Sequence, residues 1–150
     1  MLLYITTGES RERDVKPLHT IPDTVNELFY LAMREHARPA AVQFWHRDAW
    51  ASDPDWRFDR QVIQLALFLM GNLHVRGGDA VAVFGPLHPL WLQVDFAVQG
   101  LAGVPVGLPE SLSDAHLLEA LGTSDPSVIF ATDDDSASRL LALQGRLGGE

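Results

Sequence analysis

Residues 73–117, LHVRGGDAVAVFGPLHPLWLQVDFAVQGLAGVPVGLPESLSDAHL, decide the fold of this chain. Within them, 80–84 and 104–108 are short apolar runs bounded by turn residues, a pattern typical of buried strands. The stretch from about 89 to 101 is almost wholly apolar, which predicts a helix sandwiched between layers, with a proline suited to its first turn. Gly103 is expected to end that helix.

The same alternation continues toward the C-terminus. Ser113 is expected to cap a helix that runs to about 121, and 128–131 reads as a third buried strand before a weak helix over 137–143. Strands that alternate with helices imply right-handed crossovers onto a parallel sheet. The sequence therefore predicts an α/β, Rossmann-like layered subdomain with a mostly parallel sheet, its strands near 80–84, 104–108 and 128–131.

The N-terminal side predicts one helix and one strand before a second helix. Residues 1–20 read as an irregular arm with at most a short strand at 3–6, and a helix is expected over 24–37. A strand over 40–45 and a polar loop or hairpin over 46–55 follow. Thr24 and Glu27 form a capping box, and the expected core face of the first helix is Val25, Leu28, Phe29 and Ala32.

The second helix is expected over 59–73. Its apolar residues recur with the helical period, so that one side of the helix should face the core. That face is expected to comprise Val62, Leu65, Ala66 and Leu69, widened by Phe68 and Leu73.

Composition excludes several classes of protein. Eleven basic against 20 acidic residues give a net charge of −9, which argues against a nucleic-acid binder. The absence of cysteine excludes disulfides and thiolate chemistry. The longest apolar tract, 65–70, is far shorter than the roughly 20 residues of a membrane span. Arg11 and Arg13 follow the apolar start, unlike the order in a secretory signal, so we expect a cytoplasmic protein.

No residue pattern predicts a catalytic, cofactor-binding or metal site. The phosphate loop GxxxxGK[ST] and the dinucleotide motif GxGxxG are absent, and Gly85 is expected to form only a strand-to-helix turn. The serines lack the GxSxG setting of a hydrolase, and 133–135 reads as a solvated acidic turn. The histidines lack metal-ligand spacing and are expected at the surface or in caps. These candidates are Ser10, Ser52, Ser111, Ser113, His19, His36, His46, His74, His88 and His116.

Three tryptophans bracket the polar loop. Trp45, Trp50 and Trp56 could form an aromatic ligand surface, but aromatic residues that flank a hairpin are expected to pack.

The segment 56–134 resembles the N-terminal part of adenylate-forming enzymes, the superfamily of acyl-CoA synthetases, luciferases and peptide-synthetase adenylation domains. The resemblance is carried by GGD at 77–79, the strand at 80–84, Trp91, GVPV at 103–106 and SDPSVIFATDD at 124–134. The strings WLQVDFAV and LPESLSDAHL look most like bacterial long-chain fatty acyl-CoA synthetases.

That resemblance implies a parent enzyme that adenylates a fatty acid with ATP and magnesium and then transfers the acyl group to CoA. The family's ATP-phosphate loop, its adenine and ribose motifs, its hinge and its catalytic lysine have no counterpart here. No active-site residue can therefore be carried over. We expect 21–150 to be a truncated N-terminal subdomain that is inactive alone, with the remainder of the parent enzyme as its partner.

Two other hypotheses remain open at this stage. The chain could be a stand-alone interaction module that uses an exposed apolar face, including in a homo-oligomer. It could also be a small flavodoxin-like or dinucleotide-binding domain, since the alternating order of strands and helices fits both.

Overall fold

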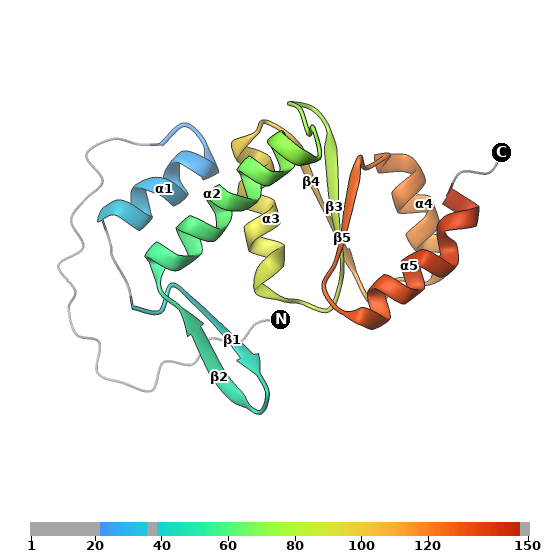
Figure 1. Ribbon diagram of the computed structural model, residues 1–150, viewed down its shortest axis with the longest axis horizontal. Coiled ribbons are helices and arrows are strands. Elements are labelled where there is room, and N and C mark those ends of the chain that lie inside the picture. Colours follow the sequence, from blue (N-terminus) through green and yellow to red (C-terminus); the bar gives the residue numbers. More distant parts are fainter. Residues whose placement is uncertain (1–21, 36–38, 148–150) are drawn as a thin grey trace.

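The computed structural model describes residues 22–35 and 39–147 (Figure 1). The predicted arm over 1–20 and its strand at 3–6 lie outside the described residues. The elements, in chain order, are α1 (Val25–Glu35), β1 (Val42–His46), β2 (Ala49–Asp53), α2 (Asp55–Asn72), β3 (Ala80–Gly85), α3 (Pro89–Gly100), β4 (Val104–Pro109), α4 (Asp114–Ser124), β5 (Val128–Ala131) and α5 (Asp134–Leu147).

Strands β3, β4 and β5 form one parallel sheet in the order β4-β3-β5. Ala82 of the central strand lies beside Val106 on one side and Ile129 on the other. Figure 1 shows α2 and α3 on one face of this sheet and α4 and α5 on the other. The predicted layered α/β fold and its three strands are therefore confirmed. The expectation that all three strands are buried holds for β3 alone, because β4 and β5 lie at the edges of this sheet and are largely half-buried or exposed.

The face covered by α2 and α3 holds the larger core. Side chains of alternate β3 residues meet the two helices there, and α1 adds aromatic packing: the Phe29 and Phe96 rings stack with centroids 4.0 Å apart. The fully or nearly buried members are Phe29, Phe58, Val62, Leu69, Val75, Val81, Val83, Val94, Ala97 and Val98.

The opposite face holds a smaller core beneath α4 and α5. The other alternate residues of β3, Ala82 and Phe84, point to this side, as the period of two in a strand requires. They pack with Leu108, Leu117, Leu121 and Leu143.

The core face of α1 is only partly as predicted. Phe29 is buried as expected, but Val25 and Leu28 are exposed, and Tyr30 and Met33 pack against the core instead. The stack of Phe29 on Phe96 fixes this orientation of the helix. Thr24 caps the helix as predicted, its Oγ1 accepting from the Glu27 N–H at 3.1 Å.

Of the two alternatives predicted for 46–55, a polar loop or a hairpin, the hairpin is confirmed: β2 pairs antiparallel with β1. Arg47 and Asp48 form its two-residue turn, with φ of 50° and 60° as a type I′ turn requires. Helix α2 begins at Asp55, four residues earlier than the predicted 59, because Pro54 stands at the N-cap position. Phe68 and Leu73 are exposed and do not widen the core.

Helix α3 ends differently from the expectation for Gly103. Ala102, with φ of 56°, takes the left-handed position that a glycine usually occupies. Gly103 follows it, and a Cβ there would lie 2.9 Å from Val98 Cγ1 and 3.0 Å from the Asp79 carbonyl oxygen. This glycine is therefore explained by close packing and not by a positive φ.

Candidate functional site at the carboxyl end of the sheet

The place in this fold where a ligand would be expected is the carboxyl end of β3 and β5. The chain leaves β3 toward α3 on one face and leaves the neighbouring β5 toward α5 on the other (Figure 1). In parallel α/β sheets a crevice opens at such a point and commonly holds the ligand. Gly85, Pro86, Thr132 and Ser136 meet at this point here.

Protein hydroxyl groups occupy the position where such a crevice would open. Gly85 has a φ of 128°, and a Cβ added there would overlap Thr132 Oγ1 and lie 2.6 Å from Ser136 Oγ. The Thr132 hydroxyl donates a hydrogen bond to the Pro86 carbonyl at 3.0 Å, and Ser136 is buried. The crevice therefore closes on itself, and Gly85 serves as the predicted strand-to-helix turn.

The acidic run at 133–135 is the start of a helix. The Asp133 carboxylate accepts from the Ser136 N–H at 2.8 Å, and hydrogen bonds from the Ser136 side chain and backbone hold the pKa of Asp133 below its usual range. Asp134 and Asp135 occupy the first turn of α5, where negative charge is favourable. The three aspartates are exposed, as predicted, but Asp134 and Asp135 belong to α5 and not to a turn, and the helix begins at 134 and not at 137.

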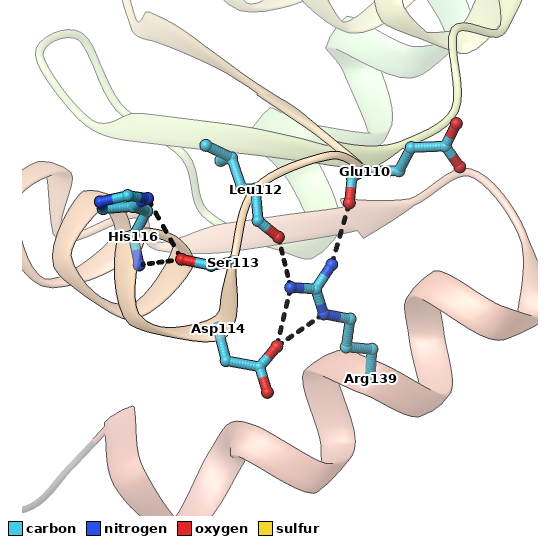
Figure 2. Close-up of polar contacts among 6 residues, drawn as sticks. All are labelled: Glu110, Leu112, Ser113, Asp114, His116 and Arg139. Atoms are coloured by element: carbon cyan, nitrogen blue, oxygen red, sulfur yellow. Dashed lines mark hydrogen bonds and ion pairs between the residues drawn. The ribbon is translucent and has the colours of Figure 1, made fainter.

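A second polar group, centred on Arg139, joins α5 to the loop between β4 and α4 (Figure 2). Arg139 Nε donates to Asp114 Oδ1 at 2.8 Å, Nη1 donates to the Glu110 carbonyl at 3.0 Å, and Nη2 donates to the Leu112 carbonyl. The guanidinium also lies over the Phe84 ring, 5.4 Å from its centroid. With its donors engaged by the protein itself, Arg139 acts as a clamp between elements.

Sequence reasoning did not single out Arg139, although a signal existed. It is the only lysine or arginine between Arg76 and Arg146. A lone cation in so long an acidic and apolar stretch indicates a specific partner, and Asp114 is that partner, with Arg139 Nη2 2.7 Å from its Oδ1.

The histidines take the capping and surface positions that were expected of them, where they can be followed. His88 Nδ1 accepts from the Leu90 N–H at 3.2 Å at the start of α3, and His116 Nδ1 lies 3.1 Å from Ser113 Oγ (Figure 2). His74 is exposed after α2, His46 ends β1, and His19 and His36 lie outside the described residues. Over 22–35 and 39–147, no three histidine, aspartate or glutamate side chains are grouped so as to hold a metal ion.

The remaining candidates are scattered. Ser113 caps α4, accepting from the His116 N–H at 3.3 Å, as predicted. Ser111 lies in the turn before that helix and Ser52 in β2, while Ser10 lies outside the described residues.

The tryptophans are less buried than expected. Trp45 and Trp50 face each other across the hairpin, with ring centroids 5.6 Å apart in a T-shaped pair. Trp45 and Trp50 therefore pack against each other, as expected, although these two rings and Trp56 are all exposed.

The parallel sheet with helices on both faces has the fold of adenylate-forming enzymes. The anthranilate CoA ligase AuaEII, solved with anthranoyl-AMP, superimposes with a TM-score of 0.70 at 17% identity, covering 82% of this chain and 23% of that chain. A Mycobacterium tuberculosis fatty acyl CoA synthetase gives 0.63 at 18% identity, covering 78% and 23%.

Sequence comparison identifies the family. The model of the AMP-binding enzyme family matches residues 36–148, so the chain belongs to that family. The long-chain-fatty-acid–CoA ligase FadD15 of Mycobacterium bovis is 28% identical over 127 residues. That match covers 74% of this chain and 21% of the relative, so the chain spans about a fifth of the relative's length.

The family implies ATP and magnesium for a whole enzyme, and the described residues do not fit them. The crevice at Gly85 is filled by Thr132 and Ser136, and the Asp133 carboxylate is engaged as a helix cap. We therefore assign no step of nucleotide chemistry to these residues. No helix of the described ranges combines the length and the apolar character needed to cross a membrane.

Proposed function

We propose that this chain is the N-terminal part of a long-chain fatty acid–CoA ligase. The whole enzyme would adenylate a fatty acid with ATP and magnesium, release pyrophosphate and pass the acyl group to the thiol of CoA. The observation that carries the proposal is the family match over 36–148 together with the similarity to FadD15, a ligase of that substrate class.

Within this proposal the chain is a scaffold. The polar side chains at the carboxyl end of the sheet serve internal packing, because Thr132 closes the crevice and Arg139 clamps two elements together. The groups that bind ATP, magnesium and CoA would lie in the remainder of the enzyme. The prediction that this chain contains no catalytic residue stands as part of the proposal.

The edge of the sheet supports a role as part of a larger body. Among the residues that the structure describes, β5 pairs only with β3, and an apolar groove of about 500 Å³ lies between β5 and α5. Ile129, Leu140 and Leu141 line the groove, and Leu141 is 69% exposed. An open strand edge next to an apolar groove is what further strands or helices would cover.

The test is fatty-acid-dependent exchange between ATP and radiolabelled pyrophosphate. We expect the purified 150-residue chain to show no exchange above a blank without enzyme, while a full-length fatty acid–CoA ligase is active in the same assay. Exchange by the chain alone would overturn the scaffold role. Absence of a phosphate-loop reading frame in the genomic sequence beyond codon 150 would count against the parent enzyme.

A stand-alone interaction module is the second candidate, and the open groove between β5 and α5 favours it. A genomic reading frame that stops at codon 150 would shift the choice to this module. The third hypothesis, a nucleotide-binding domain, is disfavoured because Thr132 and Ser136 occupy the space beside Gly85. We therefore expect ATP and NAD to leave the melting temperature unchanged, and a saturable increase would support that hypothesis instead. A cytoplasmic location remains our expectation.

A further inference from the structure

The two outer strands of the parallel sheet, β4 and β5, differ in what their free edges offer to another strand. The Val104 N–H donates to the Asp79 carbonyl on the side of β3, so the backbone nitrogens of 105, 107 and 109 face the free edge of β4. Two of these three positions are proline, which has no N–H. The edge of β4 is therefore a poor template for a further strand.

The free edge of β5 has no such protection. The Ser127 N–H donates to the Ala80 carbonyl of β3, so the backbone groups of Val128 and Phe130 face away from β3. β5 contains neither a proline nor a charged residue, and within the described ranges its one partner is β3. An apolar edge of this kind pairs readily with a further strand.

The groove beside that edge suits aliphatic side chains. A strand paired with β5 would point every second side chain into the groove, because the side chains of a strand alternate between two faces. The edge and the groove together select a strand that carries aliphatic residues two positions apart. The lining residues come from β5 and α5: Ile129, Ala131, Ala137, Leu140, Leu141 and Gln144.

Residues 2–6, LLYIT, lie outside the described residues and have this pattern. Leu3 and Ile5 are branched aliphatic residues two positions apart, without a polar atom that would need a partner in the groove. Tyr4, Ile5 and Thr6 are residue types enriched in strands. The segment belongs to the longest stretch of 1–21 that contains no charge, glycine or proline.

The connection from this segment to the described fold is long enough to reach β5. The 15 residues at 7–21 span about 50 Å when fully extended. A folded body of this chain length is about 40 Å across. A tether of this kind also holds the segment at a high effective concentration, so that even a weak pairing would be populated.

We propose that residues 2–6 pair with the free edge of β5 as a fourth strand, with Leu3 and Ile5 in the groove beside α5. The chain's own arm would thereby cover an edge that is otherwise open to pairing with other chains. The inference goes beyond the proposed function and does not rest on it. In a longer enzyme the arm would hold this edge only until later residues replace it, because N-terminal segments fold first during synthesis.

A second copy of the chain fits the same edge less well. Pairing of two β5 strands about a two-fold axis would set the residue region before β5 of one copy beside the region after β5 of the other. Exposed aspartates flank the strand on both sides, Asp125 before it and Asp133 after it. Like charges would therefore meet at both ends of the paired strands.

Hydrogen–deuterium exchange of the 150-residue chain, followed for single amides by NMR, tests the proposal. Leu3→Ser/Ile5→Ser should make the amides of Val128 and Phe130 exchange about 10-fold faster or more, because the arm no longer protects them. Leu141→Ser, which removes a side chain from the wall of the groove, should act in the same direction. The Gly107 amide on the edge of β4 should exchange at the same rate in every variant.

The matched control is Val15→Ser, which removes an apolar side chain from the same arm outside 2–6 and should change none of these rates. Circular dichroism and urea unfolding establish that each variant is folded. Equal exchange of Val128 and Phe130 in the parent chain and in folded Leu3→Ser/Ile5→Ser would overturn the proposal. So would a dimer in light scattering that Leu3→Ser/Ile5→Ser dissociates, because the arm would then serve a second copy. The experiment uses neither ATP nor a fatty acid, so its failure leaves the proposed ligase function untouched.

Discussion

The two faces of the sheet are held in different ways, although they share strand β3. On one face Val81 and Val83 meet a large apolar core under α2 and α3. On the other, Ala82 and Phe84 meet a smaller core, and the polar clamp of Arg139 completes the attachment of α5. The helices on the first face are therefore held by apolar packing. Those on the second face also depend on hydrogen-bond geometry and on the tight turn at Gly85.

The largest effect should come from the first face. Phe58→Ala removes a fully buried ring and should lower the free energy of unfolding by about 3–5 kcal/mol. Leu67→Ala, on the outward face of the same helix, should change it by less than about 0.5 kcal/mol. Urea unfolding followed by circular dichroism measures both. Similar losses for the two variants would contradict the orientation of α2.

The next effect belongs to the second face. Gly85→Ala places a Cβ against Thr132 and Ser136 at a φ of 128°, which should cost about 2–4 kcal/mol of stability. Gly122→Ala in α4 is the control, because nothing lies within 4 Å of its added Cβ and alanine favours a helix. Adding Thr132→Ala to Gly85→Ala should recover part of the loss. No recovery would mean that backbone strain alone is responsible.

The clamp is expected to contribute less than either core. Arg139→Met keeps the side-chain stem but leaves the Glu110 and Leu112 carbonyls without their donor, so stability should fall by about 1–2 kcal/mol. Asp114→Asn should cost less than about 1 kcal/mol, because half of that carboxylate side chain is in solvent. A larger loss for Asp114→Asn would make the ion pair, and not the carbonyl contacts, the main part of the clamp.

The sequence predicts the second half of the molecule well because its signals do not compete. The runs at 80–84 and 104–108 are short and apolar, and each is followed by a glycine or a proline. Their length and these end residues are enough to predict strands. In α1 and α2 there are more apolar residues than one side of the helix can hold, so the helical period alone does not show which of them are buried. The buried side of each helix depends on the element that packs against it. Phe29 of α1 stacks on Phe96, and Phe58 of α2 lies in the core with residues of α3.

The polar features at the carboxyl end of the sheet were harder to predict. Asp133 and Arg139 act through contacts with Ser136 and with residues 25 to 29 positions away, and no local pattern encodes the latter. The same holds for the filled crevice, since Gly85 and Thr132 meet only when β3 and β5 lie side by side.

A smaller effect of opposite sign is expected at the end of α3. Ala102 adopts a φ of 56°, which costs energy for any residue with a Cβ, and glycine removes this cost. Ala102→Gly should therefore stabilise the fold by about 0.5–1 kcal/mol in thermal or urea unfolding. A stabilisation of the same size by Ala137→Gly, in the first turns of α5, would show that the left-handed geometry is not the cause.

The two faces also differ in how an aspartate responds to pH. On the side of α1 and α2, burial raises the pKa of Asp59, with Arg34 opposing and Asp55 adding to the shift. The fold therefore favours neutral Asp59, and its contribution to stability is complete below the unfolded pKa of about 3.9 and is lost as the pH rises through the folded pKa. At Asp133, hydrogen bonds from Ser136 lower the pKa, so that contribution is present at neutral pH and is lost as the pH falls through the folded pKa.

Replacing each aspartate with asparagine separates the two contributions. At neutral pH, Asp59→Asn should be more stable than the parent chain, and the gap should close on acidification. Asp133→Asn should be less stable than the parent chain at neutral pH. This difference in the free energy of unfolding has the opposite sign to that of Asp59→Asn, and it should also disappear, at lower pH. Urea unfolding at several values between pH 3 and 7 measures both gaps. Gaps that stay constant with pH would mean that neither carboxylate titrates differently in the folded and unfolded chain, and the electrostatic contrast between the two faces would then be lost.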